Sequence, residues 1–118
     1  MLKNLRPILW TNAIEDTLHF YTQLLDFTIE EYNTQWGWAS ISKDDVAIMF
    51  AKPNEHKPFT QPQFTGSFYI QTTDVEMLWQ KLQSKVAICY DIATFDWGMR
   101  EFAIYDNNGY IIQFGQEI

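Results

Sequence analysis

An internal repeat constrains the fold of this chain of 118 residues more than any other feature of its sequence. At an offset of 61 residues, the segment NAIE at 12–15 aligns with TDVE at 73–76. The same offset aligns Trp36-Gly37 with Trp97-Gly98. Two landmarks at one offset indicate that the chain contains two copies of one unit of about fifty residues.

The two copies differ in length beyond these landmarks. The segment VAIMF at 46–50 matches YIIQF at 110–114 at an offset of 64, so we expect three extra residues in the turn of the second copy. Prolines at 53, 58 and 62 exclude regular structure between the copies and mark a linker. We therefore expect a single domain, 1–118, made of modules at approximately 5–52 and 65–116 and a linker at 52–64.

Each copy has the pattern of a strand, a helix and three further strands. Asn12 and Thr73 are the expected helix N-caps, because a glutamate three residues later completes a capping box. Apolar residues at helical spacing follow both caps, and Asp106-Asn107-Asn108-Gly109 is typical of a hairpin turn. The expected strands are 6–11, 27–33, 38–43 and 46–51 in the first copy, and 67–72, 86–92, 99–105 and 110–115 in the second. This order predicts an α+β fold of two tandem β-α-β-β-β modules.

The composition excludes several classes of protein. Hydrophobic residues make up 47% of the chain and charged residues 19%, which is typical of a globular domain. The net charge is −7 and no cluster of basic residues is present, so nucleic acid is not an expected partner. No apolar stretch is long enough to span a membrane, and the first residues lack the features of an export signal. With a single cysteine, Cys89, the sequence predicts a cytoplasmic protein without a membrane partner.

The order of these landmarks resembles the glyoxalase/bleomycin-resistance/dioxygenase (vicinal-oxygen-chelate) superfamily, and bleomycin-resistance proteins in particular. Phe20-Tyr21 and Leu25-Asp26-Phe27 carry part of the match. The most specific part is the run from Trp97 to Gly109, which is similar to the family pattern of Trp-Gly, a short strand, an Asp-Pro-Asp-Gly-type turn and a final strand. The resemblance implies a U-shaped mixed sheet around a ligand cleft, with helices on the convex side. It also implies a homodimer that exchanges strands or modules between chains.

Period-two alternation divides the strand residues between two faces. The residues expected to face the helices are Leu9, Ile48, Phe50, Phe68, Ile70, Ile112 and Phe114. The opposite face combines large apolar surfaces with hydrogen-bonding groups, as a binding cleft requires. Its predicted ligand-binding residues are Arg6, Ile8, Trp10, Trp38, Met49, Tyr69, Trp97, Met99, Glu101 and Gln113. An alternative is that these residues fill a dimer interface or an inner core that holds no ligand.

The resemblance also implies about three His, Gln or Glu ligands to a metal ion, and their positions fall on Arg6, Ser67, Met49 and Gln113. Arginine repels a cation, serine is a poor ligand, and a thioether is too soft for ions that prefer oxygen. Gln113 alone cannot hold a divalent ion. We therefore expect neither a metal nor another cofactor.

Three functions stay open for the sequence. The first is metal-free binding of a small aromatic or cationic molecule, such as a glycopeptide antibiotic, by aromatic residues of the cleft. The second is a non-canonical lyase, isomerase or dioxygenase-like enzyme of the same superfamily, and the third is a structural dimer without a ligand. Glu101 is accordingly a polar anchor of the cleft, a structural partner of Arg6 or a general base. No catalytic residue is assigned.

Overall fold

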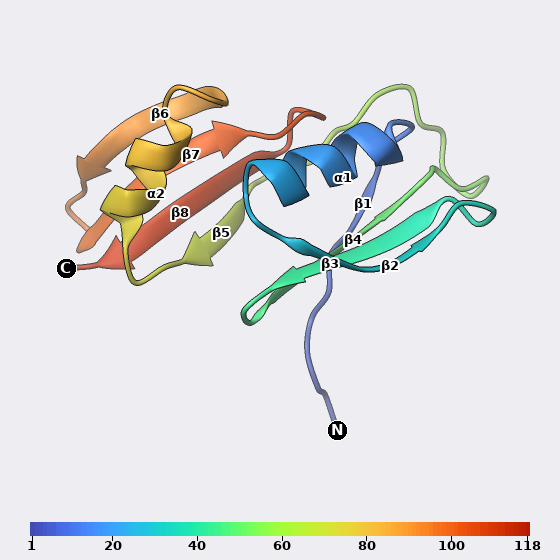
Figure 1. Ribbon diagram of the computed structural model, residues 1–118, viewed down its shortest axis with the longest axis horizontal. Helices are drawn as coiled ribbons and strands as arrows, with labels where there is room; N and C mark the ends of the chain where they lie inside the picture. The colour runs from blue at the N-terminus through green and yellow to red at the C-terminus, as the bar shows by residue number, and fades with distance from the viewer. The chain divides into compact units, whose positions relative to one another are not determined.

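Each half of the chain folds into a strand, a helix and three more strands, as the repeat predicts (Figure 1). The computed structural model describes residues 1–118 and divides into a first unit, Met1–Pro62, and a second unit, Gln63–Ile118. The elements of the first unit are β1 (Ile8–Trp10), α1 (Ile14–Gln23), β2 (Thr28–Asn33), β3 (Trp38–Lys43) and β4 (Val46–Ala51). Those of the second unit are β5 (Phe68–Gln71), α2 (Val75–Leu82), β6 (Ala87–Thr94), β7 (Met99–Tyr105) and β8 (Ile111–Glu117). The predicted α+β fold of two β-α-β-β-β modules is confirmed.

The two sheets have the same topology. Their strand orders are β1-β4-β3-β2 and β5-β8-β7-β6. In each sheet the first strand of the unit runs parallel to the last, and the remaining neighbours are antiparallel. Neither helix has the length and apolar character needed to cross a membrane.

One face of each sheet packs against the helix of its own unit. In the first unit the ring of Tyr21 on α1 lies 5.0 Å from that of Phe50 on β4. In the second unit Phe102 on β7 packs against Trp79 on α2, with ring centroids 5.2 Å apart. The residues predicted for this face are buried at Leu9, Ile48, Phe50, Ile112 and Phe114 and half-buried at Phe68 and Ile70. The prediction that these residues face the helices is therefore confirmed.

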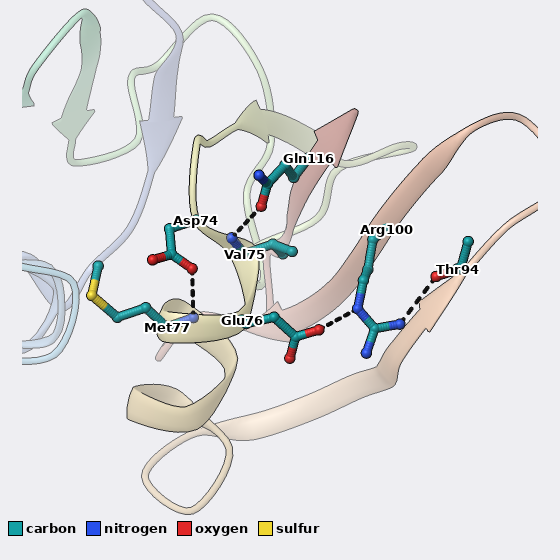
Figure 2. Close-up of polar contacts among 7 residues, drawn as sticks. All are labelled: Asp74, Val75, Glu76, Met77, Thr94, Arg100 and Gln116. Carbon is teal, nitrogen blue, oxygen red and sulfur yellow. Dashed lines mark hydrogen bonds and ion pairs between the residues drawn. The ribbon is translucent and has the colours of Figure 1, made fainter. Parts of the chain in front are cut away.

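Both helices begin one residue later than predicted, so the expected N-caps at Asn12 and Thr73 are wrong. The residue before α1 is Ala13, whose side chain makes no cap hydrogen bond. The residue before α2 is Asp74, whose carboxylate accepts a hydrogen bond of 3.1 Å from the Met77 amide (Figure 2).

The physical reason is a threonine at the same place in both copies. The Thr11 hydroxyl accepts the Ala13 amide at 2.9 Å, and the Thr72 hydroxyl accepts the Asp74 amide at 3.3 Å. Each hydroxyl thus fixes a turn of two residues before the helix starts. The asparagine and threonine expected as caps lie inside these turns.

The corrected caps give a testable difference in stability. We expect Asp74→Ala to lower the free energy of unfolding by about 1 kcal/mol, because the Met77 amide loses its acceptor. Asn12→Ala is the matched control and should leave stability unchanged within about 0.5 kcal/mol, since Asn12 is exposed and is not the cap. Urea denaturation of both variants measures the difference, and an equal loss in the two would contradict the assignment.

The hairpins of the two units differ in length. In the first unit one row across the sheet consists of Trp10, Ala51 and Trp38. The corresponding row of the second unit consists of Gln71, Gly115 and Glu101. The rows correspond because in each unit the residue after the first strand donates its backbone amide to the carbonyl of the middle residue of the row. These hydrogen bonds run from Thr11 to Ala51 at 3.0 Å and from Thr72 to Gly115 at 2.8 Å.

This correspondence locates the extra residues of the second unit. In the first unit Gly37 directly precedes the row, whereas in the second Met99 and Arg100 stand between Gly98 and the row. Counted from the row, two extra residues therefore lie at the start of β7. At the other end of the hairpin, five residues, 106–110, separate the last paired residues of β7 and β8, against two, 44–45, between β3 and β4, so the expected longer turn is also present.

The added part of β7 is attached to α2. The Arg100 guanidinium forms an ion pair with Glu76 and donates a hydrogen bond of 3.1 Å to the Thr94 hydroxyl (Figure 2). Opposite Arg100, the Gln116 side chain of β8 accepts the amide of Val75 at 2.9 Å (Figure 2). Arg100 thus faces the helix, and Glu101 faces the other side of the sheet.

Candidate functional site

A buried carboxylate lies on the face of the second sheet that is turned away from α2. Glu101 on β7 is only 1% exposed, although this face of the strand is turned away from α2, the helix of its own unit. The pairing of the strands brings Tyr69 of β5 beside Gln113 of β8, and Tyr90 of β6 beside the neighbouring part of β7. Side chains from four strands therefore meet around one negative charge.

Both oxygens of Glu101 accept hydrogen bonds from neutral donors. Oε1 accepts from the Trp97 indole at 2.8 Å and from the Tyr69 hydroxyl at 3.2 Å. Oε2 accepts from the Tyr90 hydroxyl and from the Gln113 amide, the latter at 3.3 Å. The Gln113 carbonyl in turn accepts from Ser67. We call the residues Ser67, Tyr69, Tyr90, Trp97, Glu101 and Gln113 the Glu101 cluster.

The hydrogen bonds keep Glu101 ionised. Burial alone raises the pKa of Glu101, but the donors Tyr90, Trp97, Tyr69 and Gln113 together outweigh it and leave the pKa below its ordinary value. Burial and the bond to Glu101 raise the pKa of Tyr90 to about 12, against the opposing effect of Gln113. At neutral pH the cluster therefore holds one negative charge and no cation. A carboxylate with this many donors is also a weak base.

This pKa shift predicts a pH dependence of stability. Because the pKa of folded Glu101 lies below its unfolded value, its contribution is complete above about pH 4.5 and is lost as the pH falls through the folded pKa. We expect urea denaturation between pH 7 and pH 3 to show a smaller decrease in Glu101→Gln than in the parent. Parallel curves for the two proteins would contradict this prediction.

A rigid aromatic pair stands next to the carboxylate. The Trp97 indole stacks on Phe95 with ring centroids 4.7 Å apart and an angle of 9° between the planes. The turn that carries Trp97 is closed by a hydrogen bond of 3.1 Å from the Gly98 amide to the Phe95 carbonyl, and Gly98 has the positive φ (84°) that this turn requires. Although its ring nitrogen is fixed to Glu101, Trp97 is 65% exposed. One indole surface is thus held in place and open to solvent.

The corresponding face of the first unit has a different polar group. Arg6 donates to Glu30 at 3.0 Å and to Ser40 at 3.3 Å, and the Ser40 hydroxyl donates to Glu30 at 2.6 Å. The bonds from Ser40 and Arg6 lower the pKa of Glu30. Within the first unit Arg6 therefore has Glu30 as its charged partner, and this group is electrically neutral.

Trp36, which aligns with Trp97 in the repeat, lacks the equivalent support. It is 70% exposed, and its ring neither stacks on another ring nor bonds to a carboxylate. The sequence pattern Trp-Gly is thus the same in the two turns, but only the second turn presents an indole in a fixed orientation.

The predicted ligand-binding residues divide between the two units. Within the first unit the register places Ile8, Trp10, Trp38 and Met49 on the face opposite α1. Within the second unit Tyr69, Met99, Glu101 and Gln113 share the face opposite α2, and Trp97 bonds to Glu101 from the adjoining turn. Tyr90 and Phe95 also belong to this group and were not predicted from the sequence. The pairing of β6 is irregular on both sides of Tyr90, so period-two alternation does not predict the side of the sheet on which Tyr90 lies.

The side chains at the positions that the resemblance implies for metal ligands do not fit a divalent metal ion. Arg6 is a cation engaged by Glu30, and Met49 offers only a thioether. In the second unit the Gln113 oxygen accepts the Ser67 hydroxyl, and its nitrogen points to Tyr90 and Glu101. No three His, Cys, Asp or Glu side chains come together in a group that could hold a metal ion.

Comparison with known proteins identifies the family of this fold. The model of the Glyoxalase/Bleomycin resistance protein/Dioxygenase superfamily matches residues 5–114. A comparison with curated proteins finds no match.

Several solved structures are similar over almost the whole chain. A protein of unknown function from Agrobacterium tumefaciens str. C58 matches with a TM-score of 0.82 and 17% identity, over 100% of this chain and 96% of the other. A glyoxalase/bleomycin resistance protein/dioxygenase from Nocardioides matches with a TM-score of 0.79 and 14% identity, over 100% and 85%. Lactoylglutathione lyase from Agrobacterium tumefaciens matches with a TM-score of 0.72 and 10% identity, over 97% and 92%. At these identities the similarity establishes the fold alone.

Proposed function

Since the chain belongs to the Glyoxalase/Bleomycin resistance protein/Dioxygenase superfamily, we propose that it binds a small molecule, without a metal, on the face of the second unit that carries the Glu101 cluster. The observation that carries this proposal is the exposed indole of Trp97, fixed by Phe95 on one side and by Glu101 at its ring nitrogen. A ring that is already ordered loses little conformational entropy when a ligand stacks on it. An aromatic contact of this kind contributes about 0.5–1.5 kcal/mol beyond the area that it buries.

The charge of the cluster favours a cationic ligand. Glu101 is ionised, and its four donors are neutral, so its charge is not compensated within the cluster. Arg100, which follows Gly98 by two residues, faces α2 and is engaged by Glu76. The net charge of −7 adds to the attraction. The proposed ligand is therefore an aromatic cation, with glycopeptide antibiotics as one class to test, and the protein is proposed to act as a cytoplasmic homodimer.

The alternative function, an enzyme that uses Glu101 as a general base, has less support. A general base needs a pKa near the working pH, and hydrogen bonds lower the pKa of Glu101 instead. Tyr90, with a pKa of about 12, keeps its proton at neutral pH and acts as a donor to the carboxylate. The geometry thus favours a binding role for both groups.

The proposal is tested by calorimetric titration at pH 7.5 with two planar probes of similar shape, the cation 1-methylquinolinium and neutral quinoline, and with bleomycin. We expect the cation to bind more tightly than quinoline, because only the cation is attracted to Glu101. Trp97→Ala should weaken its binding by about tenfold or more, which corresponds to about 1.4 kcal/mol.

Trp36→Ala is the matched control, since Trp36 occupies the aligned turn and is exposed to a similar extent. Its affinity should equal that of the parent. Equal effects of the two tryptophan substitutions, or a parent protein that binds none of the probes at millimolar concentration, would contradict the proposed function.

A further inference from the structure

Tyr69 reaches Glu101 only because the residue beneath it is a glycine. A Cβ atom at Gly115 would lie 1.9 Å from the Tyr69 hydroxyl oxygen and 2.6 Å from the ring carbon that bears it. Gly115 pairs with both Gln71 and Glu101, so it lies in the row between the strand of Tyr69 and the carboxylate. The glycine is therefore needed for space: it lets the hydroxyl cross β8 and approach Oε1.

Tyr69 is also the least firmly held donor of the Glu101 cluster. Its ring is 42% exposed, and its hydroxyl has Glu101 as its one hydrogen-bond partner, at 3.2 Å. The other donor to the same oxygen, Trp97, is closer at 2.8 Å and is stacked on Phe95. Tyr90, which bonds to the other oxygen, is half-buried and has a second contact with Gln113 at 2.8 Å. Rotation of Tyr69 into solvent breaks one hydrogen bond and leaves the remaining three to Glu101 in place.

We infer that Tyr69 is a displaceable cap on Glu101, whose hydroxyl occupies in the free protein the place that an N–H donor of a cationic ligand takes in the complex. Gly115 is the positioning residue that allows the cap to close. The inference rests on the proposed function and narrows its ligand to aromatic amines with an N–H group on the cation. Such a ligand stacks on Trp97 and replaces a neutral donor by a charged one at Oε1, which gives a stronger hydrogen bond.

The cap has a consequence for affinity that can be measured. When a ligand must displace an internal partner, the free energy of the internal contact is subtracted from that of binding. Tyr69→Phe removes the competing hydroxyl and keeps the ring. Gly115→Ala forces the hydroxyl away from Glu101 by its methyl group. Both variants should therefore bind an N–H cation more tightly than the parent does.

The experiment is a calorimetric titration with 2-phenylethylammonium and with its N,N,N-trimethyl derivative, which has the same charge but no N–H donor. We expect Tyr69→Phe and Gly115→Ala to bind the primary ammonium about three- to tenfold more tightly than the parent, as the loss of one competing hydrogen bond predicts. The affinity for the trimethyl compound should change by less than about twofold in both variants. A role of these residues in folding alone would not change the ratio of the two affinities.

Tyr105→Phe is the matched control, because Tyr105 is a partly exposed tyrosine of β7 whose hydroxyl makes no hydrogen bond to Glu101. It should bind both probes as the parent does. Suppose that the parent binds the primary ammonium through Trp97 but the two variants bind it equally or more weakly. The inference that the ligand displaces Tyr69 is then wrong, and the proposed function stands. If the parent binds neither probe, or if Trp97→Ala binds both as the parent does, both the proposed function and the inference about Tyr69 are wrong.

Discussion

Replacement of Glu101 by alanine is expected to lower the free energy of unfolding by about 3 kcal/mol. The reason is the set of donors that would remain: the Tyr90 hydroxyl and the Trp97 indole lose their acceptor, and the Gln113 amide keeps only Tyr90. Hydrogen bonds to a charged group contribute about 1.5–3 kcal/mol each, and solvent that enters the space beside Trp97 recovers part of the loss. Urea denaturation at pH 7 measures the difference.

Two further variants separate the carboxylate from other effects. Glu101→Gln keeps the volume but turns an amide group toward the donors, so it should also be destabilising, to a smaller extent. Glu30→Ala is the matched control on the first unit: this carboxylate also accepts hydrogen bonds, from Arg6 and Ser40, but is exposed. Its substitution should have a much smaller effect. A loss below about 1 kcal/mol for Glu101→Ala would mean that the cluster contributes little to stability.

Replacement of Phe102 by alanine is expected to have a larger effect, a loss of about 3–5 kcal/mol. Phe102 is fully buried between α2 and the second sheet, with ring centroids 5.2 Å from Trp79 and 5.4 Å from Phe114. Alanine would leave a cavity between these two rings. Thermal and urea denaturation should show the loss, and a decrease of less than about 2 kcal/mol would show that the site collapses around the smaller residue.

Phe64→Ala is the control for the loss of an aromatic ring as such. Phe64 also stacks on another ring, that of Phe68 at 4.6 Å, but about half of its surface is exposed. We expect this variant to lose about 1 kcal/mol or less. A larger loss of stability in Phe102→Ala than in Phe64→Ala would show that the effect comes from the burial of Phe102.

The fold was predictable because two signals in the sequence act together. The repeat fixed the order of elements, and period-two alternation assigned residues such as Phe50 and Ile112 to the helix side. The predicted strands 38–43, 46–51 and 99–105 have the bounds of β3, β4 and β7. Each of these strands has one face in a core, and the core imposes a regular register.

The site was predictable only in part. Glu101, Tyr69 and Gln113 were placed on one face by alternation, and the structure joins them by hydrogen bonds. Tyr90 was missed because the pairing of β6 shifts on both sides of it, and a shift in register leaves no mark in the order of polar and apolar residues. The stacking of Trp97 on Phe95 depends on the backbone of a turn, which the pattern Trp-Gly does not determine.

The pair Met99-Arg100, which precedes Glu101 in β7 and has no counterpart before Trp38 in β3, shows how a repeat of this kind can change without losing its core. Side chains of a strand alternate with a period of two, so the addition of two residues returns every later residue to its original side. One added residue would instead turn Phe102 and Ile104 out to solvent and Glu101 into the core. Within the regular part of β7, residues ahead of Glu101 can therefore be added or removed only in pairs if each later side chain is to keep its side, and an engineer who wishes to move Glu101 relative to Trp97 should insert or delete residues in pairs.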